Sequence, residues 1–339
     1  MSPSVSAAKR TPTQRFWQWV NIIIAIGLTA VGVWFIGSKT GLDDIIQAFA
    51  LAQFRYILLG LLVVMATLWL KNWRWQLLLT TPGEGKPPFI PLFWASTLGQ
   101  YVNLVLPFVR LGEIARIYTL SQHTDIGAAR ALGTLVVEKT LDFIFFTLTL
   151  LIILPLVVLP DFVGDPSTLL GTIAFVLLIV LYLLAYQTAW TIKILRWICQ
   201  KLPAAIGNRL LRIGVDGLEG LAALRNPLHS LYLVSSSLIV ALLSGYLPYI
   251  LFPAFGLSLG FLEGMLVHVV IAVVSVPPST PGKIGVFNSA VALLLLSLGV
   301  ENEAAIASYS IAFHLVAMLP IILLGVVAAS RTRWRWRTS

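Results

Sequence analysis

Charge is scarce in this chain of 339 residues, because only 11% of them are charged whereas 58% are hydrophobic. An ordinary soluble domain carries about 25% charged residues. A globule of this size could not bury so much apolar surface in one core, so lipid must solvate much of the chain. We therefore exclude a soluble protein and expect an integral membrane protein.

Cysteine is nearly absent, since Cys199 is the only one in the sequence. A single cysteine excludes an internal disulfide framework and a cysteine-rich metal site. The sequence also lacks the His, Glu and Asp spacing of a metal site, a serine nucleophile motif and the glycine spacing of a P-loop. We therefore expect no metal, no cofactor and no catalytic residue, and we do not expect an enzyme.

Acidic residues are outnumbered, with 14 Asp and Glu against 23 Lys and Arg. The basic residues lie in short segments between apolar runs, which indicates membrane topology rather than binding to nucleic acid. We place the basic tails 1–16 and 331–339 and the amphipathic loop 193–225 in the cytoplasm. Asp161 and Asp165 lie in a connection without basic residues, which we expect outside a plasma membrane of bacterial type.

Long apolar runs divide the intervening segment, 17–330, into the spans of a single membrane domain. A helix needs about 20 residues to cross a hydrocarbon core of about 30 Å, and each run is long enough. The fold class that we predict is all-α, a polytopic membrane helical bundle with about six full spans. The six runs are 17–36, 56–79, 132–159, 169–192, 231–252 and 304–329.

Two further apolar regions, 91–120 and 262–298, are interrupted by proline and glycine. Proline removes a backbone donor, so both regions should contain non-helical turns that protein or a wet cavity covers. The charge pattern fits re-entrant hairpins, which return to their own side, and equally hairpins that cross fully. The breaks that we expect are Pro107 and Gly112 in the first region, and Pro278, Pro281, Gly282 and Gly285 in the second.

A shift of 170 residues aligns the two interrupted regions, because Pro107 falls on Pro277 and Gly112 on Gly282. A charged residue follows the glycine in both regions. The same shift superimposes the long apolar runs on either side, which by the charge argument run in opposite directions. This pattern predicts an inverted repeat of 17–160 and 169–330, in which the broken helices mark the substrate site.

The densest polar cluster surrounds the first break and the start of the next long run. Ionisable groups at membrane depth are costly and usually face the interior of a bundle. Arginines beside a helix that starts near Gly112 would suit a phosphate, since arginine offers paired donors and the helix dipole favours anions. The same arginines would serve equally as topology determinants at the cytoplasmic interface. The substrate-binding residues that we expect are Asn103, Arg110, Glu113, Arg116, Glu138, Asp142, Lys283 and Asn288.

Lys283 follows the glycine of the second break and would be costly if it were unpaired in the membrane. It needs an acidic partner, a lipid phosphate or water, and we favour Glu138 or Asp142 as the acid. We further hypothesise that Lys283 shares one cavity with Arg110 and Arg116.

Two histidines, His268 and His314, fall inside apolar runs. We interpret each as a hydrogen-bonded packing residue rather than a proton relay.

Three ordered blocks resemble the flippase-like membrane domain family, which includes the transmembrane part of bacterial lysylphosphatidylglycerol synthases. The resemblance covers about residues 17–329 and implies a bundle with re-entrant helices that moves lipid headgroups between leaflets. In the synthases that lipid is an aminoacylated phosphatidylglycerol, made by an added soluble aminoacyl-transfer domain, and we do not expect this protein to be such a synthase. The family often has an acid where this chain has Asn288. The blocks are Asn103-x-x-Leu106-Pro107-x-x-Arg110-x-Gly112-Glu113-x-x-Arg116, Glu138-x-x-x-Asp142 and Pro278-x-x-Pro281-Gly282-x-x-Gly285.

The function that we predict is that of a lipid translocator for an anionic or lipid-phosphate headgroup, on a phospholipid or a polyprenyl-phosphate-type lipid. The alternative is a membrane protein that transports nothing and serves a lipid- or glycan-modifying enzyme as its partner. Such a protein would dock its enzyme through the loop 193–225.

Overall fold

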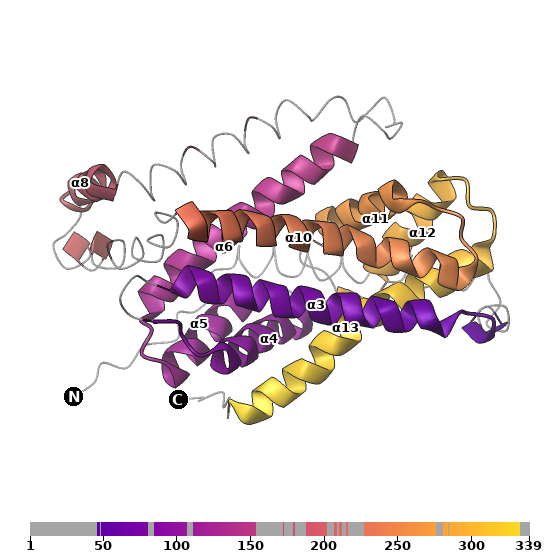
Figure 1. The fold of residues 1–339 in the computed structure, drawn as a ribbon, viewed down its shortest axis with the longest axis horizontal. Coiled ribbons are helices and arrows are strands. Elements are labelled where there is room, and N and C mark those ends of the chain that lie inside the picture. The colour runs from indigo at the N-terminus through magenta and orange to yellow at the C-terminus, as the bar shows by residue number, and fades with distance from the viewer. Residues whose placement is uncertain are drawn as a thin grey trace, which may run out of the picture.

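The computed structural model describes the chain from residue 46 to residue 332 with gaps. Every regular element among these residues is a helix, as the all-α prediction requires, and the helices form a bundle (Figure 1). The described residues are 46–47, 49–80, 85–106, 111–153, 172, 179, 188–201, 207–208, 210–211, 215, 227–275, 281–283 and 285–332.

Three helices are long and apolar enough to cross a membrane. They are α3 (Phe54–Leu79), α10 (Pro227–Leu251) with its extension η4 (Phe252–Phe255), and α13 (Glu303–Arg331). At a rise of 1.5 Å per residue, the 26 residues of α3 extend about 39 Å, more than the hydrocarbon core. These helices confirm three of the six predicted spans.

The other three predicted spans are less completely described. α6 (Ala128–Ile153) matches the run 132–159, although Glu138, Lys139 and Asp142 interrupt its apolar surface. The run 17–36 and most of the run 169–192 lie outside the described residues. The total of six spans therefore stays a prediction.

Both interrupted regions consist of pairs of shorter helices. α4 (Phe89–Val105) and α5 (Gly112–His123) flank the first break, and α11 (Phe261–Val274) and α12 (Val286–Ser297) flank the second. The short helix η5 (Pro281–Lys283) lies within the second break. Each of the four helices has fewer residues than the about 20 that a full crossing requires.

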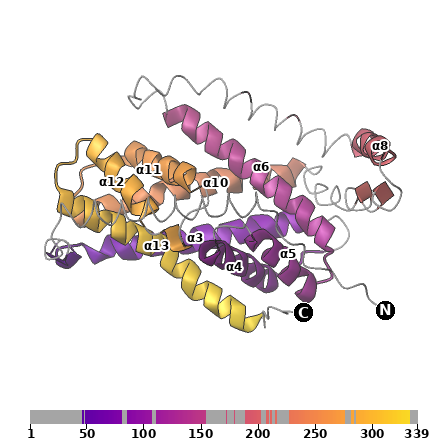
Figure 2. The same cartoon turned by 180° about the vertical axis from the view of Figure 1, so that it is seen from behind.

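The order of elements repeats along the chain. A long helix, two short helices and another long helix occur first as α3, α4, α5 and α6, and again as α10, α11, α12 and α13. α3 and α10 lie side by side and run in opposite directions, and the two pairs of short helices lie toward opposite ends of the bundle (Figures 1 and 2).

The largest core cluster joins α3, α10, α12 and α13 around Tyr309, which is fully buried. The Tyr309 hydroxyl donates a 2.9 Å hydrogen bond to the carbonyl oxygen of Pro248, inside α10, and its ring stacks on Phe252. On the outer face of α3, Leu58, Leu62 and Trp69 are exposed. Exposed apolar side chains along a helix of this length are typical of a surface that faces lipid.

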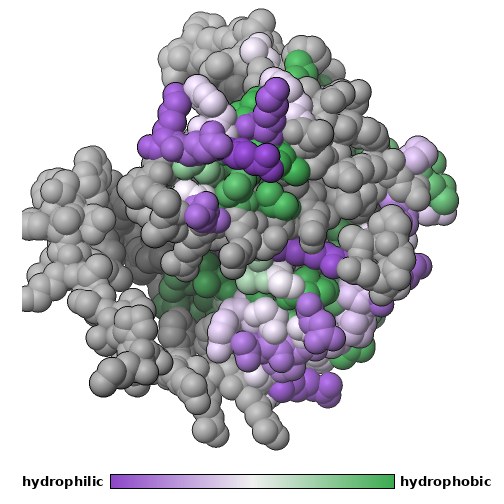
Figure 3. All heavy atoms as spheres, turned by 90° about the vertical axis from the view of Figure 1, so that its left-hand side faces the viewer, coloured by the Kyte–Doolittle hydropathy of each residue, from purple (hydrophilic) through white to green (hydrophobic). Residues whose placement is uncertain are grey.

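The polar end of the molecule carries α5 and the amphipathic helix α8 (Thr188–Cys199). Figure 3 shows hydrophilic side chains gathered on this end. α8 begins inside the run 169–192 and ends in the predicted loop 193–225, most of whose remainder lies outside the described residues. Just past α8, the Lys201 ammonium lies 3.6 Å from the ring centroid of Trp197, a pairing suited to a membrane interface.

Candidate functional site

Polar residues line one face of α4. Ser96, Gly99, Gln100 and Asn103 recur at intervals of three and four residues, which places them on the same side of an α-helix. That side faces α5, and the two helices approach closely, because a Cβ on Gly99 would lie 2.6 Å from the carbonyl oxygen of Gly112. Glycine at both positions therefore allows the first hairpin to close.

Asn103 holds the start of α5 in place. Its Oδ1 accepts a 2.8 Å hydrogen bond from the backbone N–H of Gly112, one of the donors that has no partner within a helix. Its Nδ2 donates a 3.1 Å hydrogen bond to Glu113 Oε2. Asn103 thus satisfies the helix terminus and orients the only acidic side chain of α5.

Arg116 of α5 and Glu138 of α6 form a bidentate ion pair. Arg116 Nη1 and Nη2 donate hydrogen bonds of 3.0 and 2.8 Å to the two carboxylate oxygens of Glu138. The residues are 8% and 5% exposed, and the guanidinium lies 3.6 Å from the ring centroid of Trp75 on α3. The Trp75 ring is itself fixed by a 3.1 Å hydrogen bond from its Nε1 to Thr134 Oγ1.

A second ion pair, with its arginine buried and its carboxylate partly exposed, joins α3 to α6. Arg74 is fully buried, and its Nη2 lies 2.6 Å from Asp142 Oδ1. Its Nη1 donates a 2.9 Å hydrogen bond to Ser237 Oγ on α10. Arg74 therefore connects the site to the second set of helices.

These two ion pairs border a cavity of about 130 Å³ among α3, α4, α5 and α6. Lys71 on α3 and Lys139 on α6 also face it. Neither lysine has an ion pair or hydrogen bond with another residue in the described part of the chain. The described residues that line it are Lys71, Ser96, Gly99, Gln100, Asn103, Gly112, Glu113, Arg116, Glu138, Lys139 and Asp142.

The second break is held by contacts of His314 with an amide side chain and a backbone carbonyl. The ring nitrogens of His314 on α13 lie 2.7 Å from Asn288 Oδ1 and 2.8 Å from the carbonyl oxygen of Gly282. His314 is thus a hydrogen-bonded packing residue, as predicted. Gly282 and Lys283 have positive φ of 70° and 57°, and the value at Lys283 is uncommon because it brings a Cβ close to the backbone.

Five of the eight predicted substrate-binding residues meet in the charged cavity: Asn103, Glu113, Arg116, Glu138 and Asp142. Arg110 lies outside the described residues. Lys283 and Asn288 belong to the second break, which contacts α4 through η5 but contributes no residue to the lining given above.

The acids favoured as partners of Lys283 have arginine partners instead. Glu138 pairs with Arg116, and Asp142 pairs with Arg74. The cavity shared between Lys283 and the arginines stays a prediction.

The predicted site residues did not include four that line the cavity, namely Lys71, Ser96, Gln100 and Lys139. They also did not include Arg74, which lies behind the cavity. A signal for them exists in the sequence. Ser96, Gln100 and Asn103 form a polar stripe on an otherwise apolar helix, and Lys71 and Arg74 are three residues apart on one face of α3.

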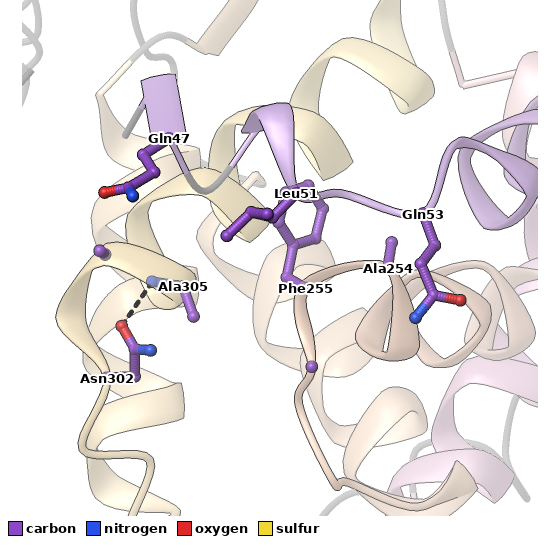
Figure 4. Close-up of a pocket in the computed structure, with 9 residues that line it drawn as sticks. Gln47, Leu51, Gln53, Ala254, Phe255, Asn302 and Ala305 are labelled. Carbon is purple, nitrogen blue, oxygen red and sulfur yellow. Dashed lines mark hydrogen bonds between the residues drawn. The ribbon is translucent and has the colours of Figure 1, made fainter. Parts of the chain in front are cut away.

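A larger cavity, of about 410 Å³, lies at the other end of the bundle (Figure 4). Among the described residues that line it, the polar side chains are the amides of Gln47, Gln53 and Asn302, and none is charged. Asn302 Oδ1 is already used, since it accepts a 2.9 Å hydrogen bond from the backbone N–H of Ala305 at the start of α13. The described lining of this cavity therefore offers no charged group to a ligand.

The apolar spans and the buried charges between them define the class, an integral membrane protein made of helices. The chain belongs to the family described as the lysylphosphatidylglycerol synthase transmembrane region, whose model matches residues 22–325. The resemblance inferred from the three sequence blocks is therefore confirmed.

The chain is also similar to archaeal membrane proteins. A UPF0104 membrane protein of Methanothermobacter thermautotrophicus is 23% identical over 331 residues, which cover 94% of this chain and 93% of the relative. One from Methanocaldococcus jannaschii is 24% identical over 67% of this chain and 92% of the relative. Another from the same organism is 31% identical, but over only 32% of this chain and 33% of that relative.

Proposed function

We propose that this protein is a lipid translocator, which moves a phosphate-bearing lipid headgroup between the leaflets of the bilayer. The charged cavity among α3, α4, α5 and α6 carries this proposal. It lies beside an interrupted pair of helices and is bordered by two ion pairs, of which Arg116–Glu138 is buried.

The physical argument starts from the cost of charge in a membrane. A headgroup cannot cross hydrocarbon without polar partners, and ionisable residues persist in membrane helices chiefly where they line a path or a binding site. The cavity supplies such partners, while the outer face of α3 exposes apolar side chains, including Leu58 and Leu62, along which acyl chains can remain in lipid.

The repeated order of elements supports the proposal further. We interpret the two sets of helices as an inverted repeat and each pair of short helices as a re-entrant hairpin. Broken helices in corresponding positions of such repeats form substrate sites in many transporters. The opposite directions of α3 and α10 agree with this interpretation (Figure 1).

Reconstituted liposomes test the proposal directly. Fluorescent phosphatidylglycerol in both leaflets would be bleached from outside with dithionite, which protein-free liposomes allow only for the outer leaflet. The purified full chain should make the inner pool accessible as well. Arg116→Gln should lose this activity because Glu138 loses its partner, whereas Lys86→Gln, at an exposed position, should keep it.

The translocator proposal would be wrong if the inner-leaflet fluorescence survived dithionite in liposomes that contain the wild-type chain. This result would have to hold for phosphatidylglycerol and for a polyprenyl-phosphate probe. The protein would then fit the alternative, a membrane partner of a lipid- or glycan-modifying enzyme.

A further inference from the structure

We infer that Lys71 and Lys139 together bind the phosphate group of a lipid headgroup, while Arg74 and Arg116 keep the cavity in shape. This inference rests on the proposed function and names the chemistry of its substrate. It assigns the phosphate to cations other than the arginines expected from the sequence.

Arg74 and Arg116 are already engaged. Both terminal nitrogens of Arg116 bind the carboxylate of Glu138, and those of Arg74 bind Asp142 and Ser237. An arginine recognises a phosphate best through two parallel N–H donors. The Nε of each guanidinium has no hydrogen-bond partner among the described residues but is buried, so the terminal nitrogens, which could meet a phosphate as a pair, are the ones already in use.

The lysines are not engaged in this way. Lys71 is partly buried and Lys139 is exposed, so one lies inside the cavity and the other at its mouth. Within the described residues neither donates to an acid, because the carboxylates of Glu138 and Asp142 pair with arginines and Glu113 accepts from Asn103. Ammonium groups at membrane depth are costly without a counter-ion, and an anionic group between them would offset that cost.

Charge and size agree with a phosphate. Among the described residues, the lining together with Arg74 comprises four cations and three acids, so two neutral pairs leave Lys71 and Lys139 with Glu113. The volume of about 130 Å³ is roughly ten times the about 10–15 Å³ that a cavity needs in order to hold one water molecule. This space suits a phosphate and a few attached atoms, with the acyl chains outside.

Lysine also suits transient binding better than arginine does. Its ammonium is a compact charge on a flexible stem, with three donors that can follow a moving phosphate. A translocator must release its substrate. Flexible lysine side chains, held beside fixed arginine ion pairs, can bind a phosphate and then release it.

Titration calorimetry of the detergent-solubilised full chain tests the inference, with dihexanoyl-phosphatidylglycerol as the probe. Lys71→Met and Lys139→Met should each weaken binding about tenfold or more, as expected for loss of a charge-assisted hydrogen bond. Lys86→Met, which removes an exposed lysine outside the cavity, should leave binding unchanged. Lys71→Arg keeps the charge and should restore most of the affinity.

Two further ligands identify the group that is bound. Dihexanoylglycerol, which lacks the phosphate, should not bind, and inorganic phosphate should bind far more weakly than the lipid. Equal binding of inorganic phosphate would overturn the assignment to a lipid, and binding of dihexanoylglycerol would overturn the assignment to a phosphate.

The lysine variants also separate this inference from the proposed function. Each variant should keep the wild-type unfolding midpoint without ligand, which shows that it folds. Wild-type affinity in both Lys71→Met and Lys139→Met would overturn the phosphate site even if the wild-type chain moves lipid. Lysine-dependent binding by a chain that moves no lipid would uphold the site and overturn the translocator.

Discussion

The two interrupted regions share an order of elements but differ in the interactions that hold them. Around α4 and α5, arginines and carboxylates form buried ion pairs, and two lysines face the same cavity. Around α11 and α12, the uncharged groups of His314, Asn288 and Gly282 form the contacts that fix the break.

This difference indicates a division of labour. Buried ion pairs contribute little net stability compared with well-packed apolar residues, because the desolvation of the charges offsets their attraction. Two ion pairs lie around the first break, whereas contacts of His314 fix the second. The ion pairs are therefore concentrated in the first half of the chain. We expect the second break to act as a frame.

Of the variants that test this comparison, Arg116→Gln should change the free energy of unfolding most. Glu138 would then be a buried carboxylate without its cation, which should lower the free energy of unfolding by about 3–5 kcal/mol. Denaturation in mixed micelles titrated with sodium dodecyl sulfate measures this change. Arg116→Leu combined with Glu138→Leu should recover most of the loss, because both charges are gone. A loss below about 1 kcal/mol in the single variant would mean that the pair behaves like an exposed one.

Gly112→Ala should have the next largest effect. The new methyl group would collide with the backbone of α4 at Gly99 and with the side chain of Asn103, forcing the first hairpin apart at a cost of about 1–3 kcal/mol. Gly127→Ala is the matched control, since nothing lies within 4 Å of a Cβ at that position, and it should change stability by less than about 0.5 kcal/mol. The same unfolding titration compares them, and equal values would show that the close approach of α4 and α5 is not required.

His314→Leu tests the frame at the second break. It removes the contacts of both ring nitrogens, so we expect a loss of about 1–2 kcal/mol in the free energy of unfolding. Lipid transport in liposomes should persist at a reduced rate. A folded His314→Leu protein without transport would instead place essential chemistry in the second half and end the division of labour.

The smallest perturbation is a pair of labelling variants, which should leave stability unchanged. In a Cys199→Ser background, a cysteine would replace Asp125, between α5 and α6, or Glu301, between α12 and α13, both of which are exposed. If the hairpins enter from opposite sides, an impermeant thiol reagent should label the cysteine at 301 in intact cells and not the one at 125. Labelling of both would argue against the inverted repeat, and the reverse pattern would overturn the orientation with cytoplasmic termini.

Local patterns in the sequence predicted the helical breaks well. Proline and glycine act on their own turn of the chain, so α4 ends at Val105 and α5 begins at Gly112, close to the residues that predicted the interruption. The same holds for the second break, where α12 begins directly after Gly285. The polar cluster around Gly112 was recognised for the same reason, since its members lie within a few turns of one another.

The partners of the charged residues could not be predicted in this way. Arg116 and Glu138 are 22 positions apart and Arg74 and Asp142 are 68 apart, and no periodicity connects them. Arg74 and Lys71 were overlooked because they stand at the end of a run that looks like a simple span. Which cation meets which acid depends on how α3 packs against α6.

The sequence by itself determined that this chain lies in a membrane, that its elements are helices and where two of them break. Hydrophobicity, proline and glycine act through solvent and through the local backbone, so their effects can be recognised without a fold. Only the tertiary structure decided that the arginines neutralise the acids and that Lys71 and Lys139 face the same cavity. Electrostatic pairing depends on distances between separate helices, which packing sets and a linear sequence does not contain.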